Sequence, residues 1–275
     1  MKKLFIVTAV ILAVSLPVFA IGNSDKGGGS AAQTSGAVSF TIGATPVPHV
    51  ELLNLIVADL AAEGITLKVI EYNDYVQPNT AVISGELDAN FFQHLPYLNG
   101  TNPEWVEKLT SAFGVHIEPM GVFSQKIGSL EEIQDGAAIA IPNDPTNGGR
   151  ALLLLAAQGL ITLDPSAGVE ATPLNIIDNP HSFRFSELEA AQLPRSLPDV
   201  DIAVINGNYA LAAGLNPTED AIAIEGADSP YVNIVVVKKG NENNPAVQSL
   251  KRALLSPKVK DYINQKWEGS VVAVF

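Results

Sequence analysis

The chain has 275 residues, of which 16 are Lys or Arg and 29 are Asp or Glu, and it contains no cysteine. The net charge of −13 argues against a nucleic-acid-binding protein, because phosphate contacts need clustered Lys and Arg. The absence of cysteine excludes thiol catalysis, disulfide frameworks, cysteine zinc sites and iron–sulfur clusters. The length predicts two domains, and the 47% hydrophobic content is typical of a globular protein.

Residues 1–20 have the pattern of a secretory signal peptide. Lys2 and Lys3 precede an apolar run over residues 4–16, and Val18-Phe19-Ala20 resembles a small-residue cleavage signal. The apolar run is shorter than the roughly 20 residues that a membrane span needs. We therefore expect an exported protein, with the Gly- and Ser-rich residues 22–37 as a flexible tether. A retained signal segment that anchors the chain is the alternative.

From residue 38 onward, strand and helix patterns alternate. The predicted strands are residues 38–44, 65–71, 88–92, 137–141, 175–178, 200–205 and 231–237. The predicted helices run from Pro48 to Gly64, over 79–84, from the Asp144-Pro145 cap to Gly159, over 244–255 and over 257–267. Ser129 and Glu132 predict a capping box before a further short helix. The alternation favours parallel strands with helices on both faces, and ligands then bind beyond the carboxyl ends of the strands.

Three loops at strand ends carry polar and aromatic residues: 72–79, 91–97 and 143–150. In the second loop, adjacent strand residues face opposite sides, so Phe91 is expected in the core. Phe92, His94 and Tyr97 follow the strand into the loop and favour a pocket for an uncharged side chain, although core and surface roles stay open.

The third loop begins a helix and ends at Arg150. The helix N-terminus and the guanidinium favour a small carboxylate, because both supply donors to an anion. The loop is not a nucleotide-binding loop, because no Gly-Lys-Ser/Thr follows. The alternative is that Arg150 pairs with a surface acid such as Asp144.

Two further asparagines are candidates for the pocket. Asn208 lies in the segment Asn206-Gly207-Asn208-Tyr209, directly after a buried strand. Asn233 interrupts an apolar run and must find either backbone or ligand partners, of which the backbone is the commoner.

Catalytic patterns are weak in this sequence. The four histidines lack metal-ligand spacing, and there is no G-x-S-x-G elbow. We therefore expect a binding protein with no catalytic residue, no metal and no cofactor.

Long motifs resemble the NlpA/MetQ family, the methionine-binding lipoproteins of bacterial ABC importers. They are NDYVQPN (73–79), DANFFQH with PYL (88–98), IPNDPTN with GRAL (141–152), NGNYA with AGL (206–215) and SPYVNI (229–234). The resemblance runs from about Phe40 to about Trp267.

The resemblance implies an α/β, two-lobed periplasmic-binding-protein fold (type II), each lobe a mixed sheet flanked by helices. We expect lobe one over 38–120 plus 228–275 and lobe two over 121–227. Such a protein closes on L- or D-methionine and delivers it to ABC permease subunits in the membrane. The family's ligand contacts fall on Tyr75, Phe92, His94, Tyr97, Arg150, Asn208 and Asn233.

In roles that agree with the loop analysis, Arg150 holds the α-carboxylate, and Asn208 and Asn233 accept from the ammonium or orient the carboxylate. The four aromatic residues line the thioether.

The chain departs from the family in one respect, because family members carry a lipid-modified cysteine after the signal peptide. Here Ala20 is followed by Ile21-Gly22. We therefore expect an exported protein in the periplasm or at the outer face of the cytoplasmic membrane, without that anchor. The alternatives in function are binding of another hydrophobic amino acid or a methionine-containing dipeptide, or a sensor or enzyme on the same fold.

Overall fold

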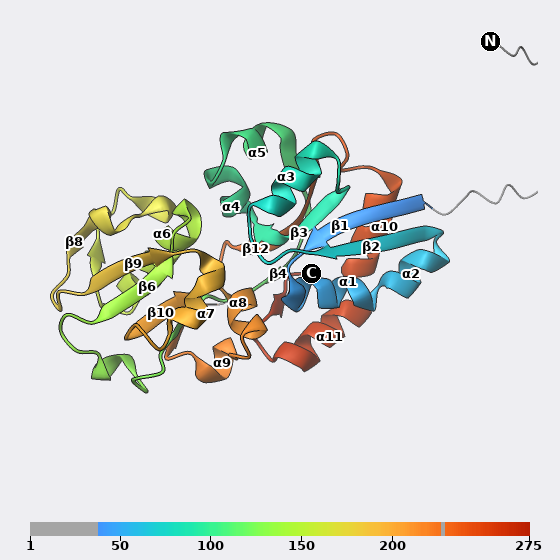
Figure 1. Cartoon of the computed structure of the whole chain (residues 1–275). Helices are drawn as coiled ribbons and strands as arrows, with labels where there is room; N and C mark the ends of the chain where they lie inside the picture. Colours follow the sequence, from blue (N-terminus) through green and yellow to red (C-terminus); the bar gives the residue numbers. More distant parts are fainter. Residues whose placement is uncertain (1–37, 227–228) are drawn as a thin grey trace, which may run out of the picture. The chain divides into compact units, whose positions relative to one another are not determined.

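The structure of the chain is a computed structural model that describes residues 38–226 and 229–275. The predicted signal peptide and tether lie outside the described residues. The described chain contains two large mixed sheets with flanking helices and one two-stranded sheet (Figure 1). This is the α/β, two-lobed architecture that the family resemblance implies.

The first sheet has six strands in the order β13-β4-β12-β3-β1-β2. Its strands are β1 (Val38–Ala44), β2 (Ile65–Glu71), β3 (Ala89–His94), β4 (Leu109–Ile117), β12 (Val232–Lys238) and β13 (Val272–Ala273). β1 pairs in parallel with β2 and β3, whereas β12 is antiparallel to β3 and β4. The predicted strands 38–44 and 65–71 are confirmed. β4, the longest strand, was missed because its residues LTSAFGVHI do not alternate between apolar and polar.

The second sheet has five strands in the order β11-β5-β10-β6-β9. They are β5 (Gly121–Phe123), β6 (Ala138–Pro142), β9 (Arg184–Leu188), β10 (Ile202–Ile205) and β11 (Ala223–Ile224). β6 is parallel to β9 and β10, but β5 is antiparallel to β10 and β11. Both large sheets are therefore mixed, as the family resemblance implies, and the parallel pairing favoured by the alternation holds for only part of each sheet. β7 (Thr162–Leu163) and β8 (Ile176–Asp178) form the small third sheet.

The two sheets draw on different stretches of the chain. The first sheet uses residues before Glu118 and after β11, and the second uses the stretch from β5 to β11. The chain passes from the first sheet to the second at residues 118–120 and returns between β11 and β12. The lobe boundaries given above stay a prediction.

The α-helices of the described chain are α1 (Glu51–Leu55), α2 (Val57–Ala62), α3 (Gln77–Ser84), α4 (Leu95–Gly100), α5 (Pro103–Lys108), α6 (Pro145–Ala157), α7 (Leu193–Ser196), α8 (Gly207–Ala212), α9 (Pro217–Asp220), α10 (Pro245–Leu254) and α11 (Pro257–Trp267). The predicted helices after Asp144-Pro145, at 244–255 and at 257–267 are confirmed as α6, α10 and α11, whereas α4, α5, α7, α8 and α9 were not predicted. Among the described residues, none of these helices has the length and apolar character needed to cross a membrane.

Two local predictions need correction. The helix predicted from Pro48 to Gly64 is a π-helical turn, Pro46–Val50, followed by α1 and α2, because the backbone of Ile56 leaves the helical region. The capping box at Ser129 is absent, since the Ser129 side chain makes no capping hydrogen bond. Glu132 instead accepts a hydrogen bond from the backbone N–H of Gly128 at 3.2 Å.

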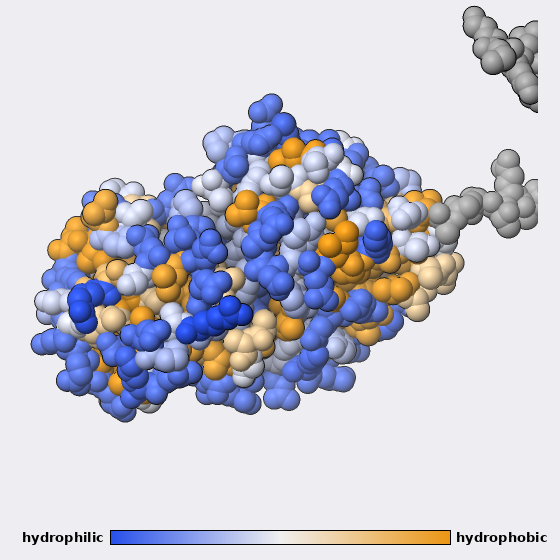
Figure 2. Space-filling model, in the orientation of Figure 1, coloured by the Kyte–Doolittle hydropathy of each residue, from blue (hydrophilic) through white to orange (hydrophobic). Residues whose placement is uncertain are grey.

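Each face of the first sheet is covered by its own apolar cluster. Phe91 packs with residues of α1, α2, α10 and α11, and Phe92 packs on the opposite face with residues of α3, α4 and α5. The predicted opposite orientation of these two phenylalanines is confirmed. Polar and apolar residues are interspersed on the outer face visible in Figure 2. Two further buried apolar clusters contain residues of the second sheet.

Candidate functional site

A pocket lies where the ends of β3, β10 and β12 meet the N-terminal part of α6. All seven residues predicted for the ligand site line it, together with five others: Tyr75, Phe92, Gln93, His94, Tyr97, Glu118, Asn147, Arg150, Asn206, Gly207, Asn208 and Asn233. The fold thus gathers the seven predicted residues into one pocket from five separate segments of the chain.

Three aromatic rings form one wall of the pocket. Phe92 extends from β3, Tyr97 lies in the first turn of α4, and Tyr75 precedes α3. The ring centroid of Tyr75 lies 5.6 Å from each of the other two rings, and Phe92 and Tyr97 are 6.0 Å apart. The Tyr97 hydroxyl donates to the Tyr75 backbone carbonyl at 3.0 Å. These contacts fix the rings as a rigid apolar wall.

His94 is a neutral hydrogen-bond donor in the pocket. It is the N-cap of α4, and its Nδ1 accepts from the Tyr97 backbone N–H at 3.1 Å. Nε2 therefore carries the proton and donates to Asn147 Oδ1 at 3.1 Å. Burial, with a smaller effect from the Arg150 charge, lowers the pKa of His94 to about 3.

Arg150 lies on α6, whose N-cap is Asp144 as predicted. The guanidinium is buried and pairs with Glu225, to which Nε donates at 3.0 Å and Nη2 at 2.5 Å. Nη2 also donates to the backbone carbonyl of Glu118 at 2.9 Å, and the guanidinium lies 4.2 Å from the centre of the Tyr231 ring. The acid that pairs with Arg150 is thus Glu225 and not Asp144. Nη1 makes no hydrogen bond with any residue that the structure describes.

The two predicted asparagines use their side-chain oxygens within the protein. Asn208 Oδ1 accepts from the Tyr75 hydroxyl at 2.5 Å. Asn233 Oδ1 lies 3.1 Å from His49 Nε2. The partner of the Asn233 side chain is therefore another side chain and not the backbone, which was the commoner expectation. The Nδ2 groups of both asparagines donate no hydrogen bond within the described chain. Both amides can therefore offer donors to a ligand.

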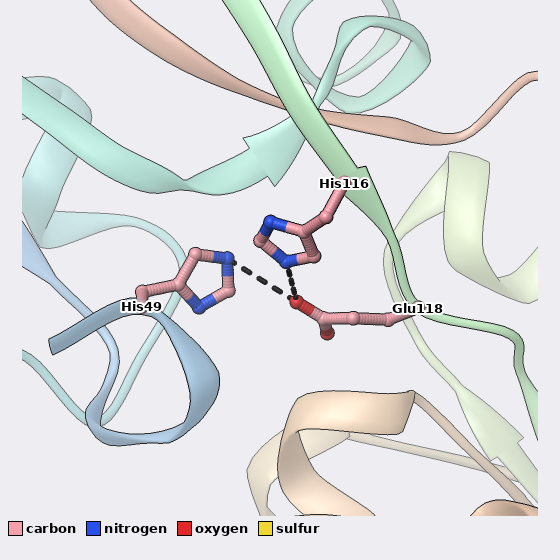
Figure 3. Close-up of side chains that lie close together, drawn as sticks. All are labelled: His49, His116 and Glu118. Carbon is pink, nitrogen blue, oxygen red and sulfur yellow. Dashed lines mark hydrogen bonds and ion pairs between the residues drawn. The ribbon is translucent and has the colours of Figure 1, made fainter. Parts of the chain in front are cut away.

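Glu118 is a buried carboxylate at the edge of the pocket, in the segment that joins the two sheets. Its Oε1 lies 2.6 Å from His116 Nε2 and 3.3 Å from His49 Nε2 (Figure 3). Burial raises the pKa of Glu118 and lowers the pKa of His116 to about 3 and of His49 to about 4. Glu118 is thus hydrogen-bonded to His116, whereas His49, which lies beside it, is hydrogen-bonded through Nε2 to Asn233.

The same three side chains bear on the expectation that the chain has no metal site. Their candidate ligand atoms all lie within 4.8 Å of one another, and two imidazoles with one carboxylate are a ligand set that Zn²⁺ takes. The 2.6 Å contact between His116 and Glu118 is the length of a direct hydrogen bond. The geometry therefore fits a hydrogen-bonded cluster more directly than a metal cage.

A search against protein families matches residues 40–275 to the NlpA lipoprotein model. The chain belongs to the NlpA lipoprotein family. It is 44% identical over 211 residues to the D-methionine-binding lipoprotein MetQ of Salmonella typhimurium, which covers 76% of this chain and 78% of that protein.

Solved structures of similar proteins agree with the family assignment. A nutrient-binding protein from Burkholderia cenocepacia bound to methionine is 48% identical with a TM-score of 0.82, covering 86% of this chain and 100% of that one. Lipoprotein Tp32 from Treponema pallidum is 38% identical with a TM-score of 0.83, with the same coverage of both chains.

Sequence reasoning missed several residues of the pocket in this NlpA-family chain. Glu118 follows strand β4, which was not predicted. Of the two histidines beside it, His116 lies on that same strand and His49 lies far from it along the chain. Asn147, Asn206 and Gly207 stand inside the motifs that were singled out, but no role was assigned to them. Gln93 follows Phe92 in the aromatic motif. Position at a strand end was the only signal that could have found these residues.

Proposed function

We propose that this chain is the extracytoplasmic substrate-binding protein of an ABC importer, and that it binds methionine in the pocket and delivers it to a membrane permease. The names of the relatives support methionine as the ligand. Export rests on the signal-peptide pattern of residues 1–20.

The single observation that carries the proposal is the combination of an aromatic wall with a buried guanidinium in one pocket. Arg150 Nη1 is unused by the described protein and suits the α-carboxylate of a small ligand. Tyr75, Phe92 and Tyr97 suit a thioether, because each sulfur–aromatic contact contributes about 0.3–1.5 kcal/mol. No nucleic acid is expected as a partner.

Binding is proposed to shift the two lobes toward a closed state. The pocket already links the elements of the two sheets, since His94 of β3 bonds to Asn147 of α6 and Tyr75 bonds to Asn208 of α8. A ligand that contacts both sides adds bonds only in the closed state, which is what a population shift requires.

The family is one of substrate-binding proteins, and we propose that this chain carries out no reaction. His94 is the obvious acid or base near a bound α-carbon, but it is held neutral as a donor. His94→Ala should weaken binding without removing any turnover, because none is expected. Steady product formation from an amino acid would overturn the assignment.

Mass spectrometry of small molecules released on denaturing the purified protein tests the ligand directly. Titration calorimetry of stripped protein with L-methionine, D-methionine, leucine and a methionine-containing dipeptide then ranks the candidates. We expect methionine to be the tightest ligand, in one enantiomer or both. Tighter binding of leucine or of the dipeptide would replace methionine by that ligand, and no binding of any of the four would refute the proposal.

A further inference from the structure

Three buried side-chain amides lie beside the aromatic wall of the pocket. They belong to Asn79 of α3 and to Asn90 and Gln93 of β3, and each side chain is at most 2% exposed. A buried apolar cluster with members in α3, β3, α4, α5 and β12 packs on the same face of the first sheet. Of the three amides, Gln93 alone lines the pocket. Polar groups in such surroundings must be paired, so their partners show what they do.

A β-bulge turns Gln93 toward the other two amides. Two adjacent residues of β12 pair with Gln93 and with Phe91, so Phe92 is an extra residue in β3. Residues three apart in a regular strand face opposite sides of the sheet, but here Gln93 Nε2 donates to Asn90 Oδ1 at 2.9 Å. The bulge therefore places Phe92 and Gln93 on the same face, which is the face that α3 covers.

The three amides form a closed hydrogen-bond network. Asn79 Nδ2 donates to Gln93 Oε1 at 3.0 Å, and Gln93 Nε2 donates back to Asn79 Oδ1 at 2.6 Å. Asn90 Nδ2 donates to the same Asn79 oxygen at 2.8 Å, and Asn90 Oδ1 accepts the second hydrogen of Gln93 Nε2. Each side-chain nitrogen and oxygen of the three amides therefore has a partner inside the network.

A network of this kind fixes geometry more than it adds stability. Each hydrogen bond makes a small net contribution to folding, and replacing a whole set of paired polar groups by apolar groups of the same shape can be nearly neutral. Hydrogen bonds are directional, however, so a fully paired buried network holds the elements that it joins at one spacing. This network joins β3, which carries Phe92, to α3, which begins two residues after Tyr75.

We propose that Asn79, Asn90 and Gln93 are positioning residues that set the width of the slot for the ligand side chain. They do so by fixing the spacing of the Tyr75 and Phe92 rings, whose centroids lie 5.6 Å apart. A slot of fixed width favours the unbranched side chain of methionine over the branched side chain of leucine, because a packed wall cannot yield to the extra branch. The inference rests on the proposed function and adds that discrimination depends on amides whose polar atoms face one another and not the ligand.

The test measures the ratio of the Kd for leucine to the Kd for methionine by titration calorimetry. One variant combines Asn79→Val, Asn90→Val and Gln93→Met, which removes the whole network and leaves no amide of it unpaired. The second variant is Gln93→Met alone. The ratio should fall by roughly fivefold or more in both variants, mainly because the Kd for methionine rises. Gln248→Met is the matched control, since it removes a single hydrogen bond on α10, from Nε2 to the Glu242 backbone carbonyl at 2.7 Å, and it should change neither Kd.

Urea unfolding separates positioning from structural support. Gln93→Met should lower the urea midpoint, because it leaves buried amide groups unpaired, whereas the triple variant should recover much of that loss. A purely structural role would restore the ratio together with the midpoint, so a wild-type ratio in the triple variant would overturn the inference. Should the triple variant fail to fold, the ratio in Gln93→Met decides, and an equal rise of both Kd values there would overturn the inference as well.

The wild-type protein supplies two further outcomes. A preference for methionine over leucine of less than about threefold would leave the network no discrimination to provide. That result would overturn the inference and leave methionine binding itself in place. If the wild-type protein binds no methionine, the proposed function and this inference fail together.

Discussion

Replacing Arg150 by alanine is the most direct test of the carboxylate site. Nε and Nη2 are occupied by Glu225 and the Glu118 carbonyl, so Nη1 is the atom left for the ligand. A hydrogen bond to a charged group contributes about 1.5–3 kcal/mol, and the residual attraction of a buried cation adds to it. We expect a total loss of about 2–4 kcal/mol, which is roughly a 30- to 700-fold increase in Kd.

The control is Lys126→Ala, which removes a positive charge from a surface ion pair. Lys126 Nζ lies 3.3 Å from Asp201 Oδ1, and both side chains are more than one-third exposed. Surface pairs contribute at most about 1 kcal/mol to stability, and this pair is not among the residues that line the pocket. Lys126→Ala should change the Kd for methionine by less than twofold.

Folding must be measured beside binding, because Arg150→Ala leaves the Glu225 carboxylate, 18% exposed, without its partner. A thermal melt of each variant without ligand separates lost stability from lost affinity. Arg150→Lys keeps the charge but loses the fork geometry, so its Kd should lie between those of wild type and Arg150→Ala. Equal small changes in Kd for Arg150→Ala and Lys126→Ala would refute the placement of the carboxylate at Arg150.

Three further predictions follow from local geometry. Gly149→Ala should lower the free energy of unfolding by about 1–3 kcal/mol in a urea titration, because the added Cβ would lie 2.2 Å from a backbone oxygen. Gly128→Ala is the control and should be nearly neutral, because its Cβ would meet only a side chain, at 3.7 Å. Tyr75→Phe should raise the Kd for methionine about 5- to 30-fold by calorimetry, since the hydroxyl that fixes the Asn208 side chain is lost and the ring is kept; an unchanged Kd would contradict this role of the hydroxyl. His94, whose folded pKa of about 3 lies below the unfolded value of about 6.5, stabilises the fold fully above pH 6.5 and loses this contribution as pH falls toward 3, by about 1.4 kcal/mol per pH unit. His94→Gln should therefore make urea-unfolding stability less dependent on pH between 6 and 4 than in wild type, and a slope equal to that of wild type would contradict the burial argument.

The sequence alone was sufficient for elements whose pattern is local. Strands β1 and β2 have the predicted bounds, because alternation of apolar and polar residues over a few positions is enough to predict a strand. The cap at Asp144 was also readable, since an N-cap depends on residues within three positions of it. Strand β4 was not, because its first residues, LTSA, do not alternate between apolar and polar and its pairing with β12 is decided far along the chain.

The seven predicted pocket residues were reached through motifs and strand ends, and the fold brings all of them to one pocket. What the sequence could not supply is which group each polar atom faces. Arg150 meets Glu225 from 75 residues away, and His49 meets Asn233 from 184 residues away. No local pattern links such positions, because their encounter depends on strand order and on where the chain crosses between sheets. Periodicity thus predicted the α/β class, and the family resemblance supplied the two-lobed fold and the full set of candidate residues. Tertiary packing alone decided the partners, since hydrogen bonds are set by distances in space and not by distance along the chain.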